Sequence, residues 1–423
     1  MKLAFSKFGE KLTAKTGILE LMDDLGSALS ARTGAIMMGG GNPAHIPKVE
    51  AIFRRRMREI LRNNNEFECM LGNYDIPQGK IEFLEAVVAF FKKTYGWNIT
   101  KENVVITGGS QDGFFKLFNI LAGNFSNGSQ KKILLPLSPE YIGYTDQGIT
   151  NDFFVSYKPS IEYLDEHMFK YHVDFDKLKI TRDIAALCVS RPTNPTANVL
   201  TNEEMQRLSD IAKAHQIPFI IDNAYGAPFP NILFNNDLEV FFDDHIVFSL
   251  SLSKFGLPST RTGIMIASKE IVQAITAVNA IASLSNSSVG QSLCLPFFKN
   301  GSIVQISKNI IQPFYAEKAE KACAWIKQYF DSSLPYFVHK SEGALFLWLW
   351  FQNLPITTNE LYERLKKRNV IVVAGSYFFA GIPENWKHKL ECIRLNYSQS
   401  PNVEEGIRIV AEEVKKAYHK KAS

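Results

Sequence analysis

Residues 184–225 read IAALCVSRPTNPTANVLTNEEMQRLSDIAKAHQIPFIIDNAY, which is the pattern of a strand, a helix and a second strand. The apolar runs Ile184–Ser190 and Phe219–Asp222 are short and uninterrupted, as is typical of strands that are buried on both faces. Between them, Thr201-Asn-Glu-Glu204 forms a capping box, and the apolar residues that follow it recur at helical spacing. The stretch therefore predicts a strand–helix–strand unit of an α/β fold.

The same alternation of apolar runs and helical patterns extends on both sides of this unit. The further runs are Val104–Thr107, Lys132–Leu137, Phe153–Tyr157, His245–Leu250 and Gly263–Ala267. Seven strands with helices between most of them predict a mainly parallel sheet covered on both faces. Ser110 and Ser268 are the predicted N-caps of two of the helices.

A smaller α/β unit is predicted after about residue 290, where the pattern changes. A helical pattern from Ile303 to Phe330 should kink or break at Pro313. It is followed by predicted strands at Tyr336–His339, Ala344–Phe351, Val370–Val373 and Leu390–Asn396, a helix that opens at Thr357, and a last helix. We expect a large domain over residues 50–290, and a small domain formed by residues 1–49 and 291–423.

Composition restricts the class of protein. The 423 residues are 46% apolar and 21% charged, which predicts a globular protein with a large core. The net charge of +4 is too small to indicate a nucleic-acid-binding surface. No apolar stretch approaches the roughly 20 residues of a membrane-spanning helix. The five cysteines contain no C-x-x-C, and the eight histidines show no metal-ligand spacing. We expect a cytoplasmic protein with no metal, membrane or nucleic-acid partner.

Polar side chains follow three successive predicted strands, where a parallel sheet binds its ligands. They include Asn194 after the fourth strand, Asp222 and Tyr225 after the fifth, and Lys254 and Arg261 after the sixth. Singly, each has an ordinary structural explanation, such as a helix cap or a surface arginine. Together they are the set that holds pyridoxal phosphate: a lysine for the Schiff base, an acid for the ring nitrogen, and donors for the ring oxygen and the phosphate.

With these motifs, the sequence resembles the fold-type I pyridoxal-phosphate enzymes of the aspartate-aminotransferase superfamily over essentially the whole chain. Within it, the chain is most similar to the valine–pyruvate (alanine–valine) aminotransferases. The segments that carry this closer likeness are FSKFGEKLTAKTGILELMDDL, GGGNPAHIP, SPEYIGY, SRPTNPTANV, DNAYGAPFP, SLSKFGLPSTRTGI and EGALFLWLWF. The resemblance implies amino transfer between a valine- or alanine-type amino acid and a 2-oxo acid (pyruvate or 2-oxoisovalerate) in amino-acid biosynthesis, by a homodimer with shared sites.

The resemblance also implies a role for each matching residue. Lys254 would form the Schiff base and act as the general base, Asp222 would pair with the ring nitrogen, and Tyr225 would bond the 3'-oxygen with Asn194. The other expected cofactor contacts are Gly109, Ser110, Gln111, Tyr141, Ser251, Ser253 and Arg261, with Tyr74 reaching the phosphate of the neighbouring subunit. The expected substrate-binding residues are Gly41, Asn194 and Arg394, of which Arg394 would bind the α-carboxylate.

Two positions depart from the pattern of the superfamily. Ala197 and Ser259 stand where glycine is common; if residue 197 adopts a positive φ, its alanine costs about 1 kcal/mol.

Two other functions stay open. One alternative is another fold-type I enzyme: a C–S lyase, a decarboxylase, a synthase, or an aminotransferase with a different substrate. The other is a non-catalytic regulator, although the residues before the core show no helix-turn-helix pattern.

Overall fold

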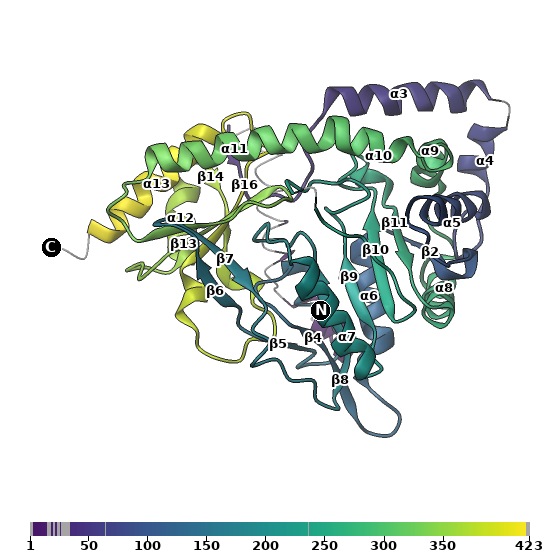
Figure 1. Cartoon of the computed structure of the whole chain (residues 1–423), viewed down its shortest axis with the longest axis horizontal. Helices are drawn as coiled ribbons and strands as arrows, with labels where there is room; N and C mark the ends of the chain where they lie inside the picture. Colours follow the sequence, from purple (N-terminus) through teal and green to yellow (C-terminus); the bar gives the residue numbers. More distant parts are fainter. Residues whose placement is uncertain are drawn as a thin grey trace.

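The computed structural model describes residues 3–14, 18–19, 22, 26, 34–63, 65–235 and 237–419. They form two large sheets and one small two-stranded sheet with helices around them, and one long helical rod lies across both large sheets (Figure 1). Part of the motif FSKFGEKLTAKTGILELMDDL, namely residues 15–17, 20–21 and 23–25, lies outside the described residues.

The larger sheet has the strand order β2-β11-β10-β9-β8-β4-β3, with β5 paired to β4. Its strands are β2 (Val104–Thr107), β3 (Gly123–Asn124), β4 (Gln130–Leu135), β5 (Phe154–Ser156), β8 (Ile184–Ser190), β9 (Phe219–Asp222), β10 (Ile246–Ser251) and β11 (Gly263–Ile266). Strands β5, β4, β8, β9 and β10 pair in parallel, whereas β11 is antiparallel to both β10 and β2. The seven predicted strands and the mainly parallel sheet are confirmed; only the two-residue β3, too short to show a pattern, was not predicted.

Three of the seven helices around this sheet begin at a residue whose side chain caps the helix. They are α3 (Pro47–Arg62), α4 (Glu66–Gly72), α5 (Ile81–Tyr95), α6 (Ser110–Leu121), α7 (Asn202–Ala214), α8 (Lys269–Ser283) and α9 (Ser288–Lys299). The Thr201 capping box of α7 and the Ser268 cap of α8 are confirmed. The predicted Ser110 cap is wrong, because Gly109 takes the capping position of α6 with φ 93°. Ser110 is instead the first helical residue, and its hydroxyl makes no cap bond.

The second sheet has the order β15-β16-β13-β12-β7-β6. Its strands are β6 (Ser160–Tyr163), β7 (Met168–His172), β12 (Tyr336–His339), β13 (Phe346–Phe351), β15 (Val373–Ala374) and β16 (Cys392–Asn396), and α12 (Thr358–Lys367) and α13 (Val403–His419) pack beside it. The hairpin β6–β7 joins this sheet through β12 although it lies within residues 50–290. It was not predicted, because three of the four β6 residues are exposed and no apolar run marks them.

The long helical rod consists of α10 (Ser302–Ile306), a π-helical turn (Ser307–Ile311) and α11 (Gln312–Tyr329). The kink or break expected at Pro313 takes the form of the π-helical turn just before the proline; Ile311 and Gln312 keep a right-handed helical backbone, so the rod continues through this point. Figure 1 shows this rod passing from the larger sheet to the second sheet. It is therefore one of the connections between the two units.

The N-terminal segment contacts both units. Strand β1 (Ile36–Met37) pairs in parallel with β14 (Val370–Ile371) beside the second sheet. Lys11 and Leu12, at the end of α1 (Lys7–Leu12), line a pocket with Gln111 of the larger unit. No helix in the described ranges is long and apolar enough to cross a membrane, and no three-residue metal cluster of His, Cys, Asp or Glu occurs there.

Candidate active site

A cavity of about 560 Å³ lies at the carboxyl ends of β8, β9 and β10, where the predicted polar residues emerge. It also reaches β16 of the second sheet, which contributes Arg394. The predicted site residues that line it are Gly41, Ser110, Gln111, Tyr141, Asn194, Asp222, Tyr225, Ser251, Ser253, Lys254, Arg261 and Arg394. The fold therefore brings together residues that are far apart in sequence: Arg394 donates a hydrogen bond to the carbonyl of Gly39, 355 residues away.

Lys254 lines this cavity and follows β10 by three residues. Its Nζ donates a hydrogen bond of 2.6 Å to the carbonyl of Gly41 and lies 5.5 Å from the centroid of the Tyr225 ring. Burial, followed by the nearby charges of Arg394 and Arg261, lowers the pKa of Lys254 to about 8. An amine with this pKa is partly neutral at physiological pH and can accept a proton.

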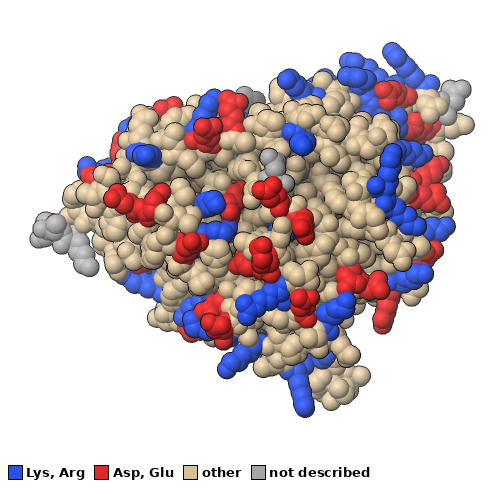
Figure 2. All heavy atoms as spheres, viewed as in Figure 1, with Lys and Arg blue, Asp and Glu red and all other residues tan. Residues whose placement is uncertain are grey.

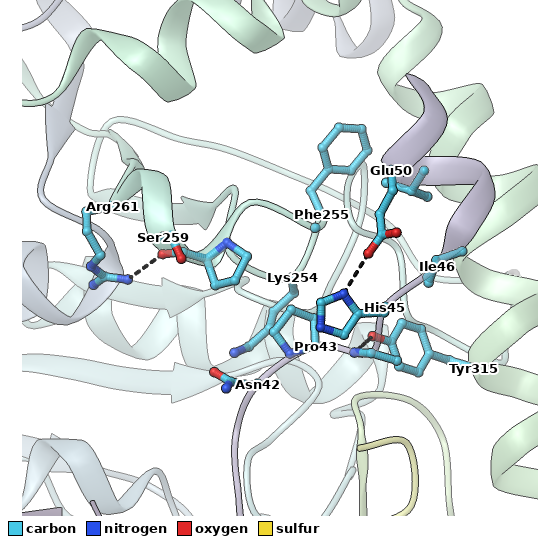
Figure 3. Close-up of a pocket in the computed structure, with 14 residues that line it drawn as sticks. Asn42, Pro43, His45, Ile46, Glu50, Lys254, Phe255, Ser259, Arg261 and Tyr315 are labelled. Atoms are coloured by element: carbon cyan, nitrogen blue, oxygen red, sulfur yellow. Dashed lines mark hydrogen bonds and ion pairs between the residues drawn. The ribbon is translucent and has the colours of Figure 1, made fainter. Parts of the chain in front are cut away.

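Lys254 and Arg261 also line a second cavity, of about 460 Å³, together with the segment 42–46 (Figure 3). Two bonds hold this segment: the amide of Ala44 donates to the Tyr315 hydroxyl at 2.9 Å, and His45 pairs with Glu50 at 2.6 Å, which Figure 3 draws as a dashed line. Asn42, Lys254 and Arg261 line both cavities.

Asp222 ends β9 as a buried carboxylate with two hydrogen bonds. Its Oδ1 accepts from the amide of Ala224 at 3.0 Å, and its Oδ2 accepts from the Tyr144 hydroxyl at 2.6 Å. Burial raises the pKa of Asp222 to about 6, while the Tyr144 bond, the Ala224 bond and the charge of Lys254 oppose the rise. The carboxylate is therefore charged at neutral pH and can accept a bond from a positively charged group.

Tyr144 and Glu140 were missed by the sequence analysis. Glu140 accepts hydrogen bonds from the amide of Ser190, at 2.9 Å, and from its hydroxyl, which fastens the Tyr141–Tyr144 loop to the end of β8. Burial raises the pKa of Glu140 to about 8. Both residues belong to the quoted motif SPEYIGY. The spacing of residues in the sequence does not indicate in which direction either side chain points.

Arg394 lies fully buried between two aromatic rings. Its guanidinium carbon is 4.2 Å from the Phe346 centroid and 5.1 Å from the Phe378 centroid. It donates to Asn194 Oδ1 at 2.8 Å and to the carbonyl of Gly39 at 2.5 Å, while its Nε is buried with no partner in the described residues. A buried guanidinium with a free N–H and no carboxylate partner is suited to bind an anion that enters the cavity.

The first turn of α6 forms a second place for an anion. The hydroxyl of Ser110 is buried without a hydrogen-bond partner in the described chain. Gly109 lies directly against Arg261, so closely that a Cβ at this position would collide with the guanidinium group. A helix N-terminus with a free hydroxyl and an arginine beside it fits a phosphate.

The structure also shows the position or backbone conformation of three further residues that the sequence analysis names. Tyr74 is 82% exposed and does not line either cavity that contains Lys254. Ala197 has φ 61°, so the positive φ considered above is confirmed. Ser259 lies in the short helix Pro258–Thr260, whose helical backbone is open to residues other than glycine.

Comparison with known proteins agrees with this geometry. Residues 56–410 match the family described as aminotransferase class I and II. The chain is 45% identical to the valine–pyruvate aminotransferase of Escherichia coli over 98% of its own length and 99% of the relative. The crystal structure of valine–pyruvate aminotransferase from Salmonella typhimurium has a TM-score of 0.88 at 44% identity, covering 95% of this chain and 100% of that one.

A solved structure from Psychrobacter arcticum is also similar, with a TM-score of 0.96 at 43% identity over 99% of this chain and 100% of that chain. The kynurenine aminotransferase of Pyrococcus horikoshii, at 20% identity and a TM-score of 0.79 over 97% of both chains, shows the fold alone. The family match covers most of the chain, and the cavity holds the polar residues that the family motifs predict. The chain is an aminotransferase with the fold-type I architecture and belongs to the aminotransferase class I and II family.

Proposed function

We propose that this aminotransferase exchanges the amino group between valine and pyruvate, giving 2-oxoisovalerate and alanine, as a step of amino-acid biosynthesis. The observation that carries the proposal is the joint placement of Lys254, Asp222 and Arg394 around one cavity. The similarity to valine–pyruvate aminotransferases over nearly the whole chain supports the choice of substrates.

The residues present fit pyridoxal 5'-phosphate. The free Ser110 hydroxyl, the α6 N-terminus and Arg261, with Gly109, Gln111, Ser251 and Ser253, would hold its phosphate; Tyr141 would stack on the ring, and Asn194, Asp222, Tyr225 and Lys254 would meet its polar atoms. When bound, this cofactor withdraws electrons from the substrate carbon that loses a proton.

Each residue then has a task of its own. The Lys254 amine accepts the proton from the substrate Cα, which its lowered pKa allows at neutral pH. Asp222, kept charged by Tyr144, stabilises positive charge at the ring nitrogen. Arg394 binds the substrate carboxylate, with Asn194 and the Gly41 backbone beside it. Burial raises the pKa of Tyr225, so its hydroxyl stays protonated and can donate a hydrogen bond.

Apolar side chains support a small branched substrate. Ile18, Met22, Phe114 and Ile142 line the same cavity as Lys254. Apolar walls favour an aliphatic side chain such as that of valine, and they leave a second carboxylate without a dedicated partner. This is the argument for valine against a dicarboxylic amino acid.

We further propose a homodimer in which Tyr74 reaches the phosphate of the partner's site. Exposed apolar side chains occur on the elements α3, α4, α5 and α8 and on the loop of Tyr74, which lie at one end of the molecule (Figure 1): Leu61 on α3, Leu71 on α4, Ile76 in the loop before α5, Ile81 at the start of α5, Ile281 on α8 and Leu284 just after α8. Apolar exposure of this extent is typical of an interface.

The surface favours small-molecule ligands over a nucleic acid. Figure 2 shows basic and acidic side chains interspersed over most of this face, with a cluster of basic side chains at one corner. The exposed residues Arg54, Arg55, Arg58 and Arg62 of α3 carry positive charge, but the whole chain has a net charge of only +4. The five cysteines are free thiols, which suits a reducing compartment such as the cytoplasm.

The test is the absorption spectrum of the purified protein loaded with pyridoxal phosphate. L-Valine should shift the cofactor band, pyruvate should restore it, and Lys254→Ala should show neither change. Product analysis separates the alternatives: 2-oxoisovalerate and alanine indicate amino transfer, whereas ammonia and pyruvate from a sulfur amino acid indicate a C–S lyase. A protein that binds no cofactor, or whose spectrum ignores valine and alanine, would contradict the proposal.

A further inference from the structure

Lys116, on α6, is a buried lysine for which the proposed reaction has no use. Only 4% of its side chain is exposed, and its Nζ donates to Asp112 Oδ2 at 2.7 Å and to Asn279 Oδ1 at 2.7 Å. Burying an ammonium group is costly unless its partners hold it in place, so its position calls for an explanation. The two partners lead in opposite directions, one to the phosphate-binding turn and one to the loop of Tyr74.

The first partner connects Lys116 to the turn that would bind phosphate. Asp112 Oδ2, which Lys116 neutralises, also accepts a hydrogen bond of 2.8 Å from the amide of Gly108. Gly108 belongs to the turn 107–111, and Asp112 lies in the first turn of α6. A carboxylate so close to a bound phosphate would repel it if its charge were not balanced. Lys116 therefore orients the turn and removes this repulsion.

The second partner connects Lys116 to the loop 73–80. The Nδ2 of Asn279 donates to the carbonyl of Pro77 at 2.9 Å and to that of Ile106 at 2.9 Å. Ile106 lies in β2, which leads directly into the turn 107–111, and its amide donates to the carbonyl of Gln78 at 2.8 Å. One asparagine side chain thus holds the strand before the turn and the loop beside it.

The loop 73–80 presents Tyr74 to the outside. The neighbouring Asp75 accepts a hydrogen bond of 2.5 Å from the Ser288 hydroxyl, and the amide of Lys80 donates to Gln291 Oε1 at 2.8 Å. The ends of the loop are therefore fixed on α9, while Pro77 in its middle is fixed through Asn279 on α8. The direction of the exposed Tyr74 depends on these anchors.

We propose that Lys116 is a positioning residue with two effects: it holds the phosphate-binding turn of its own subunit, and through Asn279 it sets the Tyr74 loop that serves the partner's site. The second effect rests on the proposed function, since it requires the homodimer with shared sites. Lys116 would thus link cofactor binding at the two sites of one dimer.

The first experiment measures the dissociation constant of pyridoxal phosphate from the homodimer by absorption titration. Lys116→Met should weaken binding about tenfold, the size expected for a lost bond to a charged group. Lys116→Arg should retain most of the affinity, and the double variant Asp112→Asn/Lys116→Met should recover part of it because no unbalanced carboxylate remains. Lys132→Met, which removes a partly buried lysine paired with Asp152, is the matched control and should bind as the native protein does.

Native affinity in Lys116→Met would overturn the proposal, and so would equal losses in Lys116→Met and Lys132→Met, which would mark a general effect of lost ion pairs. If Lys116→Met fails to fold, the comparison is made between Asp112→Asn/Lys116→Met and Asp112→Asn alone. The double variant buries no unpaired charge, and it should still bind the cofactor more weakly because Asn279 has lost its anchor.

The second experiment uses mixed dimers in which one subunit carries Lys254→Ala, so that only the native subunit forms the covalent link to pyridoxal phosphate. Adding Lys116→Met to the Lys254→Ala subunit should weaken cofactor binding in the native subunit, and adding Tyr74→Phe should do the same. An effect of Tyr74→Phe without one of Lys116→Met would overturn the link between sites. If Tyr74→Phe has no effect either, the shared-site dimer is wrong, while the homodimer titration still decides the role of Lys116 in its own site.

Discussion

The Tyr144 hydroxyl donates a 2.6 Å hydrogen bond to Oδ2 of Asp222, and both side chains are buried. Two effects on the carboxyl group compete at this contact. Burial raises the pKa of Asp222 to about 6, and the Tyr144 bond is the largest of the effects that lower it. Tyr144 therefore decides whether this carboxylate stays charged near neutral pH.

Tyr144→Phe should move the acid limb of the activity profile to higher pH. A hydrogen bond to a charged group contributes about 1.5–3 kcal/mol, which corresponds to a pKa rise of about one to two units. The pKa of Asp222 would then rise to about 7–8, and kcat/KM at pH 7 should fall about two- to tenfold while recovering at higher pH. The measurement is kcat/KM for valine between pH 5 and 9. Tyr157→Phe, which removes a hydroxyl bonded to the carbonyl of Lys179, is the control; an unmoved acid limb in Tyr144→Phe would refute the argument.

Asp222→Asn should stabilise the cofactor-free protein at alkaline pH. The folded-state pKa of Asp222 is raised from 3.8 to about 6, so its contribution to stability is fully present below pH 3.8 and is lost as the pH rises through 6. The neutral asparagine avoids this loss, which is of order 2–3 kcal/mol. Thermal unfolding should show a higher Tm for the variant at pH 8 and nearly equal values at pH 4. Equal Tm values at pH 8 would mean that the charged carboxylate costs nothing in the folded chain.

The residues to which we assign the chemistry could be predicted to lie together because several of them directly follow predicted strands of one sheet. Asp222 ends a predicted strand, and parallel strands bring their carboxyl ends to one edge. Tyr144 could not be found in this way, because it ends a short 3₁₀ turn and its direction depends on contacts with Phe114 and Phe118 on α6. The apolar periodicity of a sequence does not encode the direction of a single side chain in such a turn.

Other misses also have physical reasons. Strand β6 exposes Ser160, Glu162 and Tyr163, so the hairpin that it forms with β7 lacks the alternation of a half-buried strand. Ser110 was expected to cap α6, since serine is among the preferred N-caps. Gly109 takes that position because its φ of 93° is open to glycine, and the serine hydroxyl is left free for a ligand. The preference of serine for the N-cap position is therefore not followed at Ser110, which lines the candidate active site instead.

Ala197→Gly should leave stability almost unchanged. The φ of 61° at Ala197 strains an alanine by about 1–2 kcal/mol, which the glycine would release. The variant also loses a fully buried methyl group, worth about 0.8 kcal/mol, and gains about 0.4–1 kcal/mol of unfolded-chain entropy. These contributions cancel, so the unfolding midpoint in urea should stay near that of the native protein, with native kcat. A large shift in either direction would show that one of the opposing contributions is absent.

Arg394→Lys should impair the binding of amino acids without loosening the cofactor. A lysine cannot reproduce the planar set of donors that lets Arg394 hold Asn194, Gly39 and an incoming carboxylate together. The loss of a bidentate contact should lower kcat/KM for valine about a hundredfold, mainly by raising KM. Isobutylamine, which has the side chain of valine but no carboxylate, is the discriminating substrate for the half-reaction. If Arg394 acts on the carboxylate, the native and variant proteins should react with this amine equally slowly and bind pyridoxal phosphate equally well. An equal loss of rate with valine and with isobutylamine would instead assign Arg394 to the support of the second sheet, where it lies between Phe346 and Phe378.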